Sequence, residues 1–259
     1  MNTRNSLWQR LLSSAAFRSG YRLIPAADPR AHPLPALPGT RLELSALHPH
    51  QIQRGVDAAF VRRLLPVIDA AADIDLGVVD QRVPLGHPAK GSALLWPGGH
   101  YRLLAACVQV FQPRRIVEIG TARGISFLSM AAYAKPDTSI ITYDVMPLDK
   151  LNGFLTAQDL SLPGRELRLG DLADPIYFES QADVLRGADM LFMDGPKDGR
   201  FEYRFWEQLE VLGLKRGCLC IVDDIRLATM LKFWHSLRHP RLDLISFGHH
   251  TGTGIFWWS

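Results

Sequence analysis

Short hydrophobic runs alternate with helical stretches from residue 115 onward, and this alternation limits the folds open to the chain. The runs that predict strands are residues 115–119, 139–144, 166–169, 188–193, 218–223, 242–247 and 253–258. Helices are predicted between most of them, at residues 124–134, 149–159, 175–186, 200–213 and 226–237. Strands that alternate with helices form parallel βαβ units. We therefore predict an α/β fold with a doubly wound sheet.

The last two predicted strands have no helix between them. Only the turn 248–252 separates them, whereas a parallel crossover needs about a dozen residues or more. We therefore expect the final strand to run antiparallel in a hairpin at the sheet edge.

The residues before 100 do not share this alternation. Residues 24–50 are rich in proline and predict an irregular linker, residues 51–73 have helical periodicity, and residues 74–98 predict loops. Pro66 is expected to kink or split its helix, and a further helix is predicted from His100 to Phe111. We predict an N-terminal helical and irregular extension at residues 1–99, which serves as a lid or an oligomer arm, and a domain at residues 100–259.

Composition and charge exclude several classes of function. The net charge of the 259-residue chain is only +3, so a large nucleic-acid surface is not indicated. No apolar run reaches the ~20 residues that a membrane-spanning helix needs. The cysteines, Cys107, Cys218 and Cys220, show no metal-binding or disulfide pattern. A reducing, cytoplasmic location is therefore expected.

The first 27 residues carry arginines and no acid, with apolar side chains at near-helical spacing. This pattern predicts a basic amphipathic helix. One interpretation is a helix that packs on the domain or on a second copy in a homodimer. The alternatives are weak contact with a membrane surface, contact with a partner, and an organelle presequence.

The first predicted strand runs into a tight turn of the form Glu-x-Gly-x-x-x-Gly, with Glu118, Gly120 and Gly124. Glycine at 120 lets the backbone turn sharply and approach a ligand, because it has no Cβ. A dinucleotide-binding turn has Gly-x-Gly-x-x-Gly and presents bare amides to a pyrophosphate. Here the second glycine is missing and a carboxylate precedes the turn, so an NAD-dependent reductase is disfavoured.

Acids also follow the ends of later strands. Ligands of open α/β sheets bind at the carboxyl ends of the strands. Asp144 ends the second strand and is placed to accept hydrogen bonds from ribose hydroxyls. Asp171 follows the third strand, where the alternative is a helix cap. Asp194 ends the fourth hydrophobic run, and Asp223 and Asp224 end the fifth.

The glycine turn resembles motif I of the class I S-adenosylmethionine-dependent methyltransferases, which also have a reversed final strand. The resemblance covers residues 100–259 and implies an S-adenosylmethionine site whose Asp171, or its neighbouring amide, faces adenine. Thr121 and Ser126 would supply hydroxyls near the methionine carboxylate; the alternative is that they satisfy amides at the helix start. The cofactor-binding residues implied are Glu118, Gly120, Thr121, Gly124, Ser126, Asp144, Asp171 and Asp194.

The carboxylates after the fourth and fifth strands would repel one another unless a cation neutralised them. Hard divalent ions prefer such oxygen ligands. The set resembles the metal site of the catechol O-methyltransferase family, which implies that Asp194, Asp223 and Asp224 bind Mg²⁺ or another divalent cation. The family's Asp-x-x-Lys is matched by Asp194 and Lys197, which implies that Lys197 is the general base. Asp224 stands where the family has Asn, so the metal site departs from the family pattern.

Several aromatic and histidine residues are candidates for the acceptor pocket. His249 and His250 lie in the final turn, and adjacent side chains of an extended chain point apart, so at most one faces the site. We take His250 as the substrate contact. His100 and Tyr101 either line the mouth of the pocket or simply begin a helix. The tryptophans of the last strand, at 257 and 258, indicate packing or an oligomer contact.

The resemblance implies an O-methyltransferase that acts on a hydroxyl of a small molecule, such as a sugar, a phenol or a natural product, with help from a divalent metal. One alternative is a metal-independent methyltransferase, in which Asp194 and Asp223 bind the acceptor or act as bases. Another is a non-catalytic module that binds S-adenosylmethionine. Methylation of nitrogen in nucleic acids is disfavoured, since the chain has no Asn-Pro-Pro-Tyr run.

Overall fold

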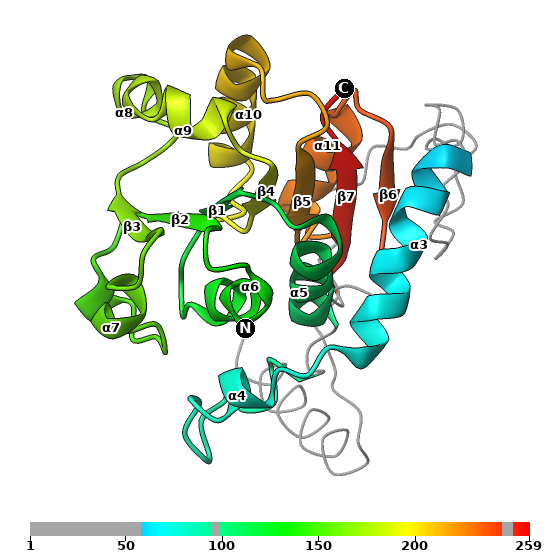
Figure 1. The fold of residues 1–259 in the computed structure, drawn as a ribbon. Coiled ribbons are helices and arrows are strands. Elements are labelled where there is room, and N and C mark those ends of the chain that lie inside the picture. The colour runs from blue at the N-terminus through cyan, green and yellow to red at the C-terminus, as the bar shows by residue number, and fades with distance from the viewer. Residues whose placement is uncertain (1–57, 95–98, 245–250) are drawn as a thin grey trace, which may run out of the picture. The chain divides into compact units, whose positions relative to one another are not determined.

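The sheet lies at the centre of the part of the chain that the structure describes. The structure is a computed structural model that describes residues 58–94, 99–244 and 251–259. Within them, seven strands form one sheet in the order β3-β2-β1-β4-β5-β7-β6 (Figure 1). The strands are β1 Arg115–Ile119, β2 Ser139–Asp144, β3 Arg165–Leu169, β4 Met190–Met193, β5 Leu219–Asp223, β6 Arg241–Asp243 and β7 Thr253–Trp257. Strands β1 to β5 are mutually parallel, while β7 runs antiparallel to both β5 and β6, as predicted.

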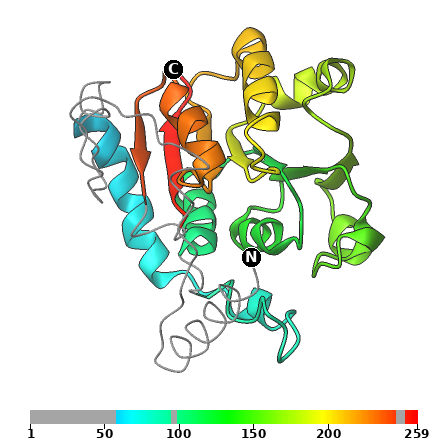
Figure 2. The ribbon, with the colours of Figure 1, turned by 180° about the vertical axis from the view of Figure 1, so that it is seen from behind.

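Helices cover both faces of this sheet. Figure 1 shows α5 (His100–Phe111) and α6 (Ile125–Tyr133) on one side, and Figure 2 shows α10 (Phe201–Leu212) and α11 (Ala228–Ser236) on the other. The remaining helical elements are α3 Ala58–Asp73, α4 Gly77–Asp80, the 3₁₀ turn η1 Leu148–Lys150, α7 Ala157–Leu160, α8 Pro175–Ser180 and α9 Ala182–Arg186.

Successive side chains of a strand point to opposite faces of the sheet, so each face has its own hydrophobic core. In β1, Ile116 belongs to the core under α5 and α6, while Val117 and Ile119 belong to the core under α10 and α11. Strands buried on both faces are nearly continuous hydrophobic runs, which is why the sequence revealed them. Cys107, Cys218 and Cys220 are unbridged and buried in these cores.

Residues before 100 take part in the first of these cores. Leu64 and Val67 of α3 and Val83 of the following loop are buried in it. The Arg63 guanidinium carbon lies 4.4 Å from the centre of the Trp257 ring, and Trp257 and Trp258 are both only 9 % exposed. The packing interpretation of the two tryptophans is therefore confirmed. The division at residue 99, and a lid or arm role for the extension, stay predictions.

Two predicted helices are wrong in extent. Residues 149–159 do not form one helix, because Gly153 packs against the Arg123 main chain, Phe154 N donates to Arg123 O at 2.8 Å, and Asn152 takes a φ of 48°. Residues 175–186 divide into α8 and α9 at Gln181, whose side-chain oxygen accepts from Tyr143 and Arg168. By contrast, α3 continues through Pro66 without splitting.

Some predictions lie outside the described residues. They concern the basic segment 1–27, the linker 24–50, residues 51–57 of the predicted helix, residues 245–247 of the sixth strand, and His249 and His250. No helix in the described ranges is both long and apolar enough to cross a membrane.

Candidate active site

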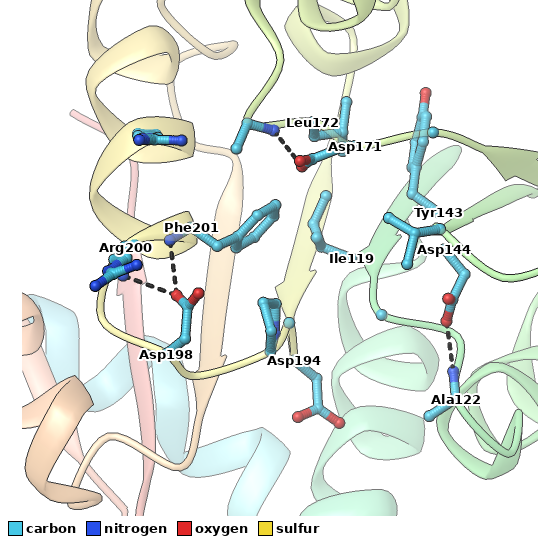
Figure 3. A pocket seen from close by; sticks show the side chains of 17 residues that line it. Ile119, Ala122, Tyr143, Asp144, Asp171, Leu172, Asp194, Asp198, Arg200 and Phe201 are labelled. Atoms are coloured by element: carbon cyan, nitrogen blue, oxygen red, sulfur yellow. Dashed lines mark hydrogen bonds between the residues drawn. The ribbon is translucent and has the colours of Figure 1, made fainter.

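A cavity of about 500 Å³ opens at the carboxyl ends of β1 to β4. Its walls combine apolar side chains with acids from different strands (Figure 3). Val145, Leu172 and Phe201 supply apolar surface. Asp144, Asp171 and Asp194 supply carboxyl groups. A mostly apolar cavity with a few convergent polar groups is typical of a small-molecule site.

The glycines of the β1–α6 turn are required by close main-chain packing. Gly120 has a φ of +95°, and a Cβ there would lie 2.2 Å from the Asp194 carbonyl oxygen. Gly124 has a φ of +75°, and its Cβ would lie 2.5 Å from Leu155 Cβ. Gly120 also lines the cavity. The turn therefore packs against the loop after β4 and also forms part of the cavity wall.

Glu118 is a fully buried carboxyl group on β1. Ser126 Oγ donates a hydrogen bond to Glu118 Oε1, while Oε2 accepts no well-formed hydrogen bond within the described residues. Burial raises the pKa of Glu118 to about 8, the hydroxyls of Ser126 and Thr142 oppose this shift, and the charges of Asp194 and Asp144 add to it. A cationic ligand group beside Glu118 would stabilise its ionised form.

The two acids predicted to hold the nucleoside both line the cavity. Asp144 Oδ2 accepts from the amides of Thr121 and Ala122 at 3.1 and 3.0 Å, which ties β2 to the glycine turn (Figure 3). Asp171 Oδ1 accepts from Ala173 N at 2.8 Å. The alternative of a helix cap at Asp171 is wrong, because Asp174 is the residue that caps α8. Contacts with ribose and adenine stay predictions.

The hydroxyls of the turn lie inside the protein. Thr121 Oγ1 is 2.6 Å from Thr142 Oγ1, and both side chains are buried. Ser126 is buried and bonded to Glu118. Neither residue lines the cavity, so their proposed place beside a methionine carboxylate stays a prediction.

Asp194, Asp223 and Asp224 form a carboxylate cluster beside the cavity. One carboxylate oxygen from each lies within 4.8 Å of the others, which confirms that the strand ends bring them together. β7 and the turn before it help to hold them, since Thr253 Oγ1 donates to Asp223 Oδ1 at 2.8 Å and Thr251 Oγ1 donates to Asp224. Three carboxylates with this spacing fit a hard divalent cation by donor type.

The Lys197 ammonium lies between two members of this cluster. Lys197 Nζ forms ion pairs with Asp194 and with Asp224 Oδ2, the latter at 2.5 Å. Burial alone would lower the pKa of Lys197, but the charges and hydrogen bonds of Asp194 and Asp224 outweigh it and raise the pKa above its ordinary value. The amine is therefore protonated in this arrangement. It accepts a proton only in a state where it has left these carboxylates, and the base role stays a prediction.

Tyr101 lies in the first turn of α5. Burial raises its pKa well above the ordinary value, and the charges of Asp194, Asp223 and Glu118 raise it further. The His100 and Tyr101 ring centres are 3.8 Å apart. Both residues begin α5, as one interpretation had it; a contact with the acceptor stays a prediction. His250 lies outside the described residues.

Other residues of the site were not identified from the sequence. Phe201 and Arg204 line the cavity from α10, and Thr253 reaches Asp223 from the antiparallel strand. Val145 and Leu172 also line the cavity. These two could have been predicted from their position, because each directly follows an acid at a strand end.

Comparison with known proteins places the fold. No protein-family model and no curated protein matches the chain. Among solved structures, an SAH-bound methyltransferase from Podospora anserina is 15 % identical, with 79 % of this chain and 98 % of that chain covered and a TM-score of 0.52. The chain has the fold of the class I S-adenosylmethionine-dependent methyltransferases.

Two further solved structures are similar at lower TM-scores. A methyltransferase from Geobacter sulfurreducens is 20 % identical, covers 78 % of this chain and 97 % of its own, and has a TM-score of 0.47. An O-methyltransferase from Bacillus cereus in complex with SAH is 16 % identical, covers 78 % and 92 %, and has a TM-score of 0.46.

Proposed function

We propose that this protein is an S-adenosylmethionine-dependent O-methyltransferase that acts on a hydroxyl of a small molecule, such as a sugar, a phenol or a natural product, with a divalent cation. One observation carries the proposal: Asp194 belongs both to the cavity wall and to the carboxylate cluster. A methyl donor in the cavity would therefore lie next to acids that can hold an acceptor hydroxyl. The modest net charge of +3 favours a small acceptor over a nucleic acid.

The cavity offers matching chemistry for each part of the cofactor. Val145, Leu172 and Phe201 provide apolar surface for adenine, and Asp144 provides a carboxylate for ribose hydroxyls. Glu118 is buried and does not itself line the cavity, but the next two residues, Ile119 and Gly120, do. Its carboxyl is our candidate to receive the cationic amino group of the methionine part. The Podospora methyltransferase of the same fold is SAH-bound, which supports a cofactor of this kind.

The reaction joins the acceptor oxygen to the methyl carbon. The acceptor oxygen attacks in line, the carbon–sulfur bond breaks, and its electron pair remains on sulfur, which becomes neutral. The acceptor proton passes to a base of the chain, for which Lys197 is our first candidate and Asp194 the next. Asp194, Asp223 and Asp224 would hold a divalent cation, which would lower the pKa of an acceptor hydroxyl.

A metal-independent methyltransferase is the second candidate, and one observation favours it. Lys197 already neutralises part of the cluster charge through its ion pairs with Asp194 and Asp224. In this version Asp194 and Asp223 bind the acceptor hydroxyl and one of them takes its proton. A non-catalytic S-adenosylmethionine-binding module would keep the cavity but transfer no methyl group.

One experiment separates these functions. The full chain is incubated with methyl-labelled S-adenosylmethionine and a panel of phenols, sugars and natural-product alcohols, with EDTA or with added Mg²⁺, and products are identified by mass spectrometry. The proposal predicts a labelled methyl ether that EDTA abolishes and Mg²⁺ restores. A product that survives EDTA supports the metal-independent version. Cofactor binding without any product supports the non-catalytic module.

A further inference from the structure

Lys197 has a backbone conformation that a lysine rarely adopts. Its φ is +58°, in the left-handed region. Such a conformation is strained for a residue with a Cβ and persists only where the surroundings fix it. Contacts from other parts of the protein must therefore hold Lys197 in place in the loop 194–200, which connects β4 to α10.

Glu202, in the first turn of α10, provides the first of these contacts. Its side chain is fully buried. Glu202 Oε1 accepts from Lys197 N at 2.7 Å, and Oε2 accepts from Gly199 N at 3.0 Å. Both carboxylate oxygens thus bind the main chain of the loop, and hydrogen bonds from amides to an ionised acceptor are among the stronger ones in proteins.

Thr229, in the first turn of α11, provides the second contact. Thr229 Oγ1 donates to the Lys197 carbonyl oxygen at 2.7 Å. The loop also lies close to this helix at Gly199, where an added Cβ would be 3.1 Å from the Thr229 carbonyl oxygen. The amide and the carbonyl of Lys197 are therefore held by two different helices.

We propose that Glu202 and Thr229 are positioning residues, which hold the Lys197 main chain so that its ammonium lies between Asp194 and Asp224. Neither side chain bonds the cluster itself in the contacts described above; each acts through Lys197. A catalytic effect of this positioning rests on the proposed function. The positioning of Lys197 itself does not depend on that function.

Reactivity of the lysine amine tests the positioning directly. The full-length chain, without added metal, is treated with dilute acetic anhydride, and the labelling rate of each lysine is measured by peptide mass spectrometry. In Glu202→Gln and Thr229→Val, labelling of Lys197 is expected to be about fivefold faster or more, the factor for losing about 1 kcal/mol of hydrogen bonding. The exposed Lys150 should label equally in every variant.

Two matched variants control for the substitutions themselves. Glu210→Gln makes the same change on the same helix, at a carboxylate that accepts the Trp206 indole N–H at 3.2 Å. Thr229→Ser keeps the hydroxyl. Both should label Lys197 at the wild-type rate. Unchanged Lys197 labelling in folded Glu202→Gln and Thr229→Val would overturn the proposal, and Thr229→Val decides alone if Glu202→Gln does not fold.

The kinetic consequence is measured with an accepted substrate. Glu202→Gln and Thr229→Val should lower kcat while the KM of the acceptor stays close to wild type, and Thr229→Ser should restore kcat. An equal fall of kcat in Glu210→Gln would contradict a specific positioning role. A wild-type chain that transfers no methyl group would contradict the proposed function, and the labelling rates would still decide the positioning.

Discussion

Lys197 Nζ and Asp224 Oδ2 lie 2.5 Å apart, in an ion pair that joins the loop after β4 to the end of β5. The same ammonium also pairs with Asp194. The carboxylate cluster thus contains a cation from its own chain, and any divalent ion must compete with Lys197 for two of the three acids. We therefore expect the position of Lys197 to influence how this cluster binds a divalent ion.

Removal of this cation tests its role. Lys197→Met should lower kcat about 100-fold or more, as expected for loss of a general base, and should leave the affinity for S-adenosylmethionine nearly unchanged. The measurements are steady-state kinetics and calorimetry. Lys215→Met is the matched control, because Lys215 pairs with Asp189 at the opposite end of β4. Full activity in Lys197→Met would contradict a role in proton transfer.

The pKa of Glu118 predicts a pH dependence of stability. Its folded-state pKa, about 8, lies above the ordinary value of 4.5, so the folded state holds the proton more tightly than the unfolded state. The resulting stability is fully present below about pH 4.5 and is lost as pH rises toward 8, by about 1.4 kcal/mol for each pH unit between the two pKa values. Urea unfolding should show wild type losing stability relative to Glu118→Gln over this range. Parallel pH curves for the two proteins would disprove the assignment.

The same group predicts proton release on cofactor binding. A cationic amino group beside Glu118 favours its ionised form, so binding of S-adenosylmethionine at pH 7 should release a proton in wild type and none from this position in Glu118→Gln. Calorimetry in buffers with different ionisation enthalpies measures the number of protons released on binding. Equal proton release by the two proteins would show that the amino group binds elsewhere.

The close approach of the glycine turn to the β4 loop predicts a large effect at Gly120. Gly120→Ala adds a Cβ 2.2 Å from the Asp194 carbonyl oxygen at a φ of +95°, and should destabilise the fold by roughly 3 kcal/mol or more. Gly213→Ala is a control with a φ of +70° and no atom within 4 Å of the added Cβ. It should cost only about 1–2 kcal/mol. Equal urea midpoints for the two variants would contradict the predicted clash.

The carboxylate cluster predicts where a metal binds. Asp194→Asn and Asp223→Asn should each weaken Mn²⁺ binding about tenfold or more, as expected for loss of a metal ligand or of a group that orients one. Asp171→Asn is the control and should leave Mn²⁺ binding unchanged. Mn²⁺ electron paramagnetic resonance measures the free ion. A wild-type chain that binds no Mn²⁺ would favour the metal-independent version of the reaction.

The sequence predicted the strand ends well because parallel strands bring their carboxyl ends to one edge of the sheet. Asp144 and Asp171 therefore reach the cavity, and Asp194, Asp223 and Asp224 meet, as expected. The antiparallel final strand was also predicted, since the turn before it is too short for a crossover.

Other features depend on contacts that no local pattern reveals. The position of the Lys197 ammonium requires a left-handed φ fixed by side chains of two later helices. The failed helix at 149–159 results from main-chain packing of Gly153 against Arg123. Glu202 looked like an ordinary helical acid, because nothing near it in the sequence indicates that it is buried.

Calorimetric titration of the full chain with S-adenosylhomocysteine measures whether the cavity beside Asp194 holds the cofactor. We expect one site with a Kd of roughly 1–100 µM, in the usual range for enzyme ligands. Asp144→Ala should bind at least about tenfold more weakly, because a charged hydrogen-bond acceptor is lost. No heat of binding by wild type, or undiminished affinity in Asp144→Ala, would contradict cofactor binding in this cavity.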